Sequence, residues 1–166
     1  MQIAGFNELS LSDYPKKVSC VIFTAGCPHA CEYCQNWDMI TASDSDWADI
    51  QDILILVEAY KTKIDAIVVS GGEPLIHGDL QLLLSELKTK FPDFLLKLDT
   101  TGLPILSFYN IVKSGLIDYV ALDFKVNSLM AHQERYYDTL LGDMDLLREQ
   151  KVPYELRTTV HPALVS

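Results

Sequence analysis

Five short apolar segments alternate with segments of helical periodicity along the chain. Their length and the turn-forming residues that bound them are typical of buried strands. They cover residues 18–24, 64–70, 94–99, 117–124 and 154–160. Strands that alternate with helices at this spacing form successive βαβ units. The sequence therefore predicts an α/β fold in which parallel strands alternate with helices.

The segments between these strands predict helices. Ser45 or Asp46 is expected to begin the first helix, since both residue types are common N-caps. Pro104 and Gly115 frame a shorter helix, and a weaker helical pattern covers residues 133–150. Between residues 70 and 94, leucines recur at helical spacing at positions Leu80, Leu83, Leu84 and Leu87.

Length and composition limit the possible classes of protein. A chain of 166 residues with 49% hydrophobic residues is expected to form a single domain over residues 1–166. No apolar run approaches the ~20 residues that span a membrane, and no signal segment starts the chain. The net charge of −10 argues against a nucleic-acid surface. We expect a cytoplasmic protein that binds neither nucleic acid nor membrane, since metal-like cysteine spacing fits a reducing compartment.

Polar and glycine residues gather where each predicted strand ends. Cys27 follows the first strand, residues 70–74 (SGGEP) follow the second, and residues 99–102 (DTTG) end the third. Asp123 and Lys125 end the fourth strand. Ligands of parallel sheets and barrels bind at the carboxyl ends of the strands. The pattern therefore places all four clusters on one rim, where a binding site is expected.

Each of these clusters also has a purely structural interpretation. Gly71 and Gly72 allow close backbone approach to a ligand, but they could equally form an ordinary turn. Asp99 could bind a ligand or cap a helix. Asp123 and Lys125 lie two residues apart, so they point to one face of a strand. They could form a structural salt bridge or hold a charged cofactor.

Three cysteines with the spacing CxxxCxxC predict a metal site on the loop after the first strand. Cys27, Cys31 and Cys34 would fill three coordination positions and leave a fourth open. An iron–sulfur cluster with one free iron, a zinc site completed by His29, and a disulfide loop all remain possible. Cys20 lies among apolar residues and is interpreted as a small buried hydrophobe.

This motif, with Tyr33 before its last cysteine, resembles the signature of radical S-adenosylmethionine (SAM) enzymes. The resemblance implies that the cysteines hold a [4Fe–4S] cluster whose free iron is chelated by SAM. SGGEP resembles the family's GGE motif, whose backbone binds the ammonium of the methionine moiety at Gly72. Tyr33 and Gln35, beside the cysteines, are then further candidates for cofactor binding.

Two more segments resemble glycyl-radical-enzyme activases within that family. The activases carry an LDTNG motif, to which the segment LKLDTTG of this chain is similar, and a DxK segment, to which YVALDFK is similar. The resemblance implies cofactor contacts for Asp99, Asp123 and Lys125. The opening FNELSLSDYPKKVSCVIFTAGC resembles the anaerobic ribonucleotide reductase activating proteins, and in YELRTTV Arg157 would face the site.

The chain departs from these relatives in three ways. Thr101 stands where the family usually has Asn, and Gln35 replaces a frequent His. The relatives continue through a further helix and strand beyond Ser166. We therefore expect a partial (βα)6-type radical SAM barrel that lacks the last strand, either as a shortened barrel or as a truncated chain.

The resemblance implies a defined reaction. An electron from a flavodoxin- or ferredoxin-type donor would cleave SAM to methionine and a 5′-deoxyadenosyl radical. That radical would then remove a Cα hydrogen from a glycine of anaerobic ribonucleoside-triphosphate reductase. The alternatives are a radical SAM enzyme acting on a small molecule, in the manner of 7-carboxy-7-deazaguanine synthase, and a non-enzymatic zinc-binding module.

Overall fold

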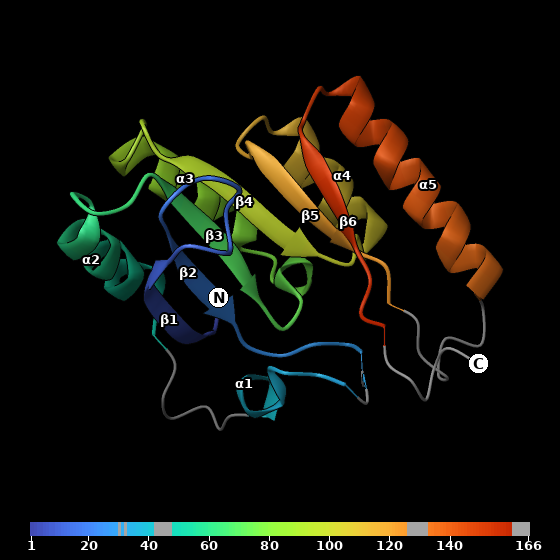
Figure 1. Ribbon diagram of the computed structural model, residues 1–166, viewed down its shortest axis with the longest axis horizontal. Helices are drawn as coiled ribbons and strands as arrows, with labels where there is room; N and C mark the ends of the chain where they lie inside the picture. The colour runs from blue at the N-terminus through green and yellow to red at the C-terminus, as the bar shows by residue number, and fades with distance from the viewer. Residues whose placement is uncertain (30, 32, 42–47, 126–132, 161–166) are drawn as a thin grey trace.

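The computed structural model describes residues 1–29, 31, 33–41, 48–125 and 133–160. The strands form one six-stranded sheet in the order β1-β2-β3-β4-β5-β6 (Figure 1). Five neighbouring strands are parallel and confirm the predicted strand pattern: β2 (Ser19–Thr24), β3 (Ala66–Gly71), β4 (Leu95–Thr100), β5 (Tyr119–Asp123) and β6 (Tyr154–Arg157). The α/β fold class is therefore confirmed.

A sixth strand, which the sequence analysis did not predict, lies at one edge of the sheet. β1 (Ile3–Ser10) pairs with β2 in the antiparallel direction. Only the first and last of its residues, Ile3 and Ser10, are buried. Because Gly5, Asn7 and Glu8 interrupt its apolar residues, the segment lacks the continuous apolar run that marked the parallel strands.

Four helices connect the parallel strands and bury one face of the sheet. They are α2 (Ile50–Tyr60), α3 (Leu80–Lys90), α4 (Ile105–Lys113) and α5 (Gln133–Glu149). The four leucines predicted to form one face of α3 are all at most 2% exposed and belong to the main hydrophobic core. Gly115, directly after α4, has a positive φ of 71°, as expected for a helix C-terminus.

The start of α2 differs from the prediction. Asp49 caps this helix and accepts a hydrogen bond from the backbone N–H of Asp52, whose carboxylate in turn accepts from the backbone N–H of Asp49. This reciprocal capping box fixes the first turn at Ile50. Ser45 and Asp46, which were expected to begin the helix, lie outside the described residues.

Two short elements follow the polar segments after β2 and β3. α1 (Trp37–Thr41) comes after the cysteine motif, and the 3-10 turn η2 (Pro74–Ile76) comes after the glycine pair. Both are too short to show helical periodicity in the sequence. None of the described helices is long and apolar enough to cross a lipid bilayer.

The other face of the sheet carries a smaller apolar cluster. Val21, Ala66 and Val68 pack there with Tyr14, which comes from the segment between β1 and β2. Side chains alternate between the two faces of a strand. Leu95 on β4 and Tyr119 on β5 pack against this cluster, so they mark the second face. Asp99 is four residues after Leu95, and Asp123 is four residues after Tyr119, so both aspartates lie on the same face. The candidate site lies at the carboxyl ends of the strands on this face.

Candidate functional site

A pocket of about 400 Å³ lies at the carboxyl ends of the parallel strands. This volume is within the range of ~300–1,000 Å³ that small-molecule sites occupy. The structure brings together in its lining all nine residues that the sequence analysis selected: Cys27, Cys31, Tyr33, Cys34, Gln35, Gly72, Asp99, Asp123 and Lys125. Arg157, expected to face the site, lines the pocket as well.

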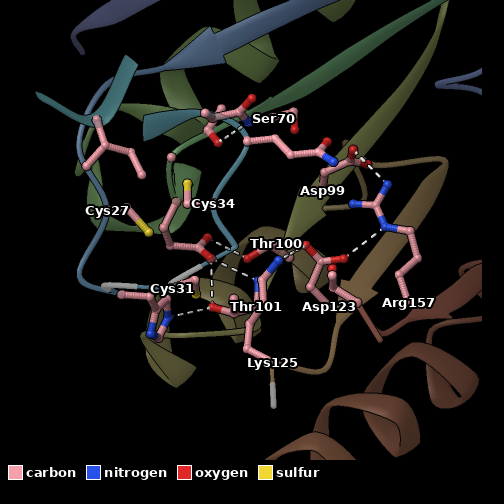
Figure 2. A pocket seen from close by; sticks show the side chains of 18 of the residues that line it. Cys27, Cys31, Cys34, Ser70, Asp99, Thr100, Thr101, Asp123, Lys125 and Arg157 are labelled. Atoms are coloured by element: carbon pink, nitrogen blue, oxygen red, sulfur yellow. Dashed lines mark hydrogen bonds and ion pairs between the residues drawn. The ribbon is translucent and has the colours of Figure 1, made fainter. Parts of the chain in front are cut away.

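The three cysteines of the motif form one side of this pocket (Figure 2). The Cys27 and Cys34 thiols are half-buried, and the Cys31 thiol is buried. Among the described residues, no three His, Cys, Asp or Glu side chains converge to hold a single metal ion. Cys20 is fully buried in the main core, and burial raises its pKa to about 12. It is therefore an apolar core residue, as its sequence neighbours indicated.

Hydrogen bonds connect the cysteine loop to the ends of β3 and β4. Asn36 donates from Nδ2 to the carbonyl oxygen of Gly71 at 3.0 Å. His29 Nε2 lies 3.2 Å from Thr101 Oγ1. Burial lowers the pKa of His29, and the nearby Lys125 lowers it further. The His29 ring thus faces the end of β4.

Tyr33 lies next to the cysteine thiols. Burial raises its pKa to about 12, and the Cys31 thiol beside it contributes in the same direction. At that pKa its phenol stays neutral at physiological pH. Tyr33 therefore adds a neutral hydroxyl to the cysteine side of the pocket.

The glycine pair at the end of β3 is required by packing against the end of β2 and the loop that follows it. A Cβ atom on Gly72 would lie 1.8 Å from the carbonyl oxygen of Gly26, and one on Gly71 would lie 2.2 Å from the backbone nitrogen of Thr24. Gly71 also has a positive φ of 116°. Gly72 therefore packs closely against Gly26 in the neighbouring loop, and the predicted approach of its backbone to a ligand stays a prediction.

Glu73 is a site residue to which the sequence analysis gave no role. Its carboxylate is 1% exposed and accepts four hydrogen bonds, from Thr100 Oγ1 (2.5 Å), Thr101 Oγ1 (2.7 Å), Thr101 N (2.8 Å) and Leu75 N (3.1 Å). Burial raises the pKa of Glu73, and these donors oppose the rise. The carboxylate thus joins the segment after β3 to the end of β4. An acidic residue followed by proline after a glycine pair was the available signal.

Charged side chains from three adjacent strands form the other side of the pocket (Figure 2). Arg157 on β6 donates from Nε to Asp123 at 2.9 Å and from Nη1 to Asp99 at 3.2 Å. Lys125 donates from Nζ to Asp123 at 2.8 Å. The Asp123–Lys125 pair considered from the sequence is therefore present, as part of a larger set of ion pairs. The Asp123 and Lys125 side chains are 19% and 24% exposed.

The chemistry of this donor set fits an iron–sulfur cluster and a zwitterionic ligand. Thiolates are the usual ligands of such clusters. The opposite side of the pocket offers carboxylates and cations in alternation, and backbone groups at the two glycines lie beside the cysteine loop. A ligand with an ammonium and a carboxylate would find a group of opposite charge for each.

Comparison with known proteins identifies relatives. Residues 21–161 match the Radical SAM superfamily. The chain is 32% identical over 171 residues to the "putative glycyl-radical enzyme activating enzyme" of Methanocaldococcus jannaschii, covering 98% of this chain and 70% of that protein. It is also 32% identical over 69 residues to 7-carboxy-7-deazaguanine synthase of Halobacterium salinarum, covering 42% of this chain and 26% of that protein.

A solved structure shares the fold. QueE from Escherichia coli superposes with a TM-score of 0.52 at 16% sequence identity, covering 95% of this chain and 94% of that one. At this identity the likeness concerns the arrangement of strands and helices. It agrees with the parallel sheet and alternating helices described above.

Proposed function

This chain belongs to the radical SAM superfamily, and from that membership we propose that it installs a glycyl radical on a partner enzyme. Members of the superfamily use a [4Fe–4S] cluster and SAM. The observation that carries the proposal is the similarity to the Methanocaldococcus jannaschii protein, which extends over 98% of this chain. The proposed partner is anaerobic ribonucleoside-triphosphate reductase, and the proposed electron donor is of the flavodoxin or ferredoxin type.

In this proposal, the cysteine side of the pocket holds the cluster. Cys27, Cys31 and Cys34 are the ligands, and Tyr33 and Gln35 contact the cofactors from the same loop. The support is that all five residues line one pocket. Cluster and SAM, when bound, supply the radical that removes a hydrogen atom from the partner's glycine.

The charged side of the pocket binds and orients SAM. Asp99, Asp123 and Lys125 provide charged contacts, and the backbone at Gly72 provides hydrogen-bonding groups. These side chains already hold one another in place through Arg157, so the site is preorganised before the ligand binds. The protein thereby positions the cofactor and limits the access of water to it.

A small-molecule substrate is the second candidate. The match to 7-carboxy-7-deazaguanine synthase supports it, although that match covers only 42% of this chain. Both candidates use the same cofactors and differ only in what donates the hydrogen atom.

The cluster assignment is tested by counting iron. Single variants Cys27→Ala, Cys31→Ala, Cys34→Ala and Cys20→Ala are reconstituted with iron and sulfide without oxygen. We expect the first three to lose cluster iron and its visible absorbance, while Cys20→Ala retains both. Retention of a full cluster in the Cys31 variant, or its loss from the Cys20 variant, would overturn the assignment.

The substrate is tested with the reconstituted, reduced protein. Incubation with SAM and anaerobic ribonucleoside-triphosphate reductase is expected to give the electron paramagnetic resonance signal of a glycyl radical. In the comparison, the same protein is given SAM and the small-molecule substrate of a 7-carboxy-7-deazaguanine synthase, and the formation of 7-carboxy-7-deazaguanine is measured. Product in the second reaction without a glycyl radical in the first would favour the small-molecule function.

A further inference from the structure

A buried lysine lies directly behind the charged side of the pocket. Lys97 is on β4 two residues before Asp99, so the two side chains point to the same face of the sheet. The residue is 1% exposed. Lysine is almost never fully buried unless it is paired. The sequence analysis assigned no role to Lys97, since nothing in the local pattern indicates its partners.

Lys97 extends the ion pairs of the pocket into the interior. Its Nζ lies 3.3 Å from Asp99 Oδ1 and 3.1 Å from Glu155 Oε1, and it donates to the carbonyl oxygen of Asp13 at 2.5 Å. With the pairs already described, three carboxylates and three cations alternate across β4, β5 and β6. In order they are Glu155, Lys97, Asp99, Arg157, Asp123 and Lys125. We call this series the charge chain.

Asp99 is the pocket-lining carboxylate that Lys97 contacts directly. It is 6% exposed and has two cationic neighbours, Lys97 at Oδ1 and Arg157 at Oδ2. Burial raises the pKa of Asp99. The cations of Arg157 and Lys97 lower this pKa, and the Asp123 carboxylate raises it. Without Lys97, the one cation next to Asp99 would be Arg157, which also pairs with Asp123. Asp99 Oδ1 would then have no cationic neighbour among the described residues.

We propose that Lys97 is a positioning residue for the SAM site, which keeps Asp99 ionised and its carboxylate fixed at the pocket wall. This inference rests on the proposed function, in which the pocket binds SAM. Lys97 does not touch the ligand, because it does not line the pocket. It acts through Asp99, which does line the pocket.

The other groups near this pair are compatible with such a role. Lys97 Nζ lies 5.7 Å from the centre of the Tyr119 ring, and the centre of the Tyr14 ring lies 5.7 Å from that of Tyr119. Both phenols have a pKa raised mainly by burial, so they stay neutral. Among the described residues, the charged groups paired with Lys97 and Asp99 are therefore those of the charge chain, and the backbone carbonyl of Asp13 is an uncharged acceptor for Lys97.

The test compares Lys97→Met with Lys88→Met in the reconstituted holoprotein. Lys88 pairs with Asp118 at 2.6 Å near the opposite end of β4, away from the pocket, and serves as the control. Calorimetric SAM affinity is measured from pH 6 to pH 9. We expect Lys97→Met to bind SAM about tenfold more weakly than the parent near pH 7, because the variant loses the cation at Oδ1 that holds the Asp99 carboxylate in place and ionised.

The pH profile separates positioning from mere support of the fold. In Lys97→Met the loss should shrink as pH rises and Asp99 ionises, whereas Lys88→Met should follow the parent at every pH. In an Asp99→Asn background, Lys97→Met should cause no further loss. A lower melting temperature with unchanged SAM affinity at all pH values would overturn the proposal. So would equal losses with and without the Asp99 carboxylate.

A second variant covers the case in which Lys97→Met does not fold. Glu155→Gln removes the competing partner of Lys97 at a side chain that is 37% exposed. Asp99 should then interact with Lys97 more strongly, and the fall in SAM affinity on acidification should begin at a lower pH than in the parent. If this fall begins at the same pH or at a higher pH, the proposal is contradicted. If the parent itself binds no SAM, the proposed function fails, and this outcome is distinct from every variant result.

Discussion

Two buried carboxylates show how much the immediate neighbours of a residue decide its chemistry. Glu73 is 1% exposed and accepts four hydrogen bonds, so its charge is stabilised. Asp143 on α5 is 4% exposed, and its Oδ2 accepts no hydrogen bond from the described residues. This oxygen is 2.2 Å from the position that a Cβ on Gly102 would occupy. Burial alone raises the pKa of Asp143 to about 7.

Asp143 should therefore make the protein less stable as pH rises. Its pKa is near 3.8 when unfolded and about 7 when folded, so between these values only the folded state holds the proton. Stability falls wherever the folded state binds more protons. A shift of this size corresponds to about 4 kcal/mol. The free energy of unfolding of Asp143→Asn should therefore rise relative to that of the parent between about pH 4 and pH 7. The difference gained over this range should reach at most about 4 kcal/mol.

Urea unfolding of the apo protein at a series of pH values measures this difference. Asp145→Asn is the control, because its side chain lies on the same helix and is 76% exposed. We expect the Asp145→Asn curve to run parallel to that of the parent. If the Asp143→Asn curve were also parallel, burial would not be controlling this carboxyl group.

At the scale of elements, the parts that could be predicted from the sequence are those with a repeating pattern. The five parallel strands and the leucine face of α3 follow from apolar runs and helical spacing. β1 could not be predicted, because its place depends on pairing with β2 rather than on its own pattern. The start of α2 depends on the capping box of Asp49 and Asp52, in a stretch where several Asp residues were candidates.

The same limit applies to the candidate site. The lining residues at the strand ends could be placed because carboxyl ends of parallel strands meet on one rim. The partners of Lys97 come from β6 and from the segment after β1, at sequence distances of 58 and 84 residues. Three of the four hydrogen bonds that Glu73 accepts come from the end of β4, at sequence distances of 27 and 28 residues. A single sequence contains no local signal for such contacts.

The loops after β2 and β3 should tolerate no side chain at Gly72. A methyl group there would meet the Gly26 carbonyl oxygen at 1.8 Å, and the two backbones would have to separate. We expect Gly72→Ala to lower the free energy of unfolding of the apo protein by about 1–3 kcal/mol. Gly78→Ala is the control, since a Cβ at Gly78 would meet nothing within 4 Å.

Urea unfolding without cluster or SAM separates two reasons for the glycine. A packing requirement appears in the apo protein, whereas a requirement of the cofactor alone does not. Gly72→Ala with the stability of the parent would therefore contradict the packing explanation. Gly78→Ala should stay within about 0.5 kcal/mol of the parent.

For the molecule as a whole, the pocket joins segments that are far apart in the chain. Its lining extends from Asp13 through the cysteine loop to Thr159 and includes the ends of β3, β4 and β5. The amino ends of the same strands are remote from it. A ligand in the pocket should therefore stabilise one end of the sheet against local opening and leave the other end unchanged.

Amide hydrogen exchange of the holoprotein with and without SAM should show this polarity. At a SAM concentration of 100 times Kd, binding stabilises the bound state by about 2.7 kcal/mol, which is about a hundredfold in an opening equilibrium. Amides of residues 70–73, 99–102 and 123–125 should slow by up to this factor, because their local opening breaks the site. Amides of residues 61–64, 91–94 and 114–117 precede strands at the opposite end and open without disturbing the pocket. Equal protection at both ends, or protection at the amino ends alone, would mean that SAM binds somewhere other than this rim.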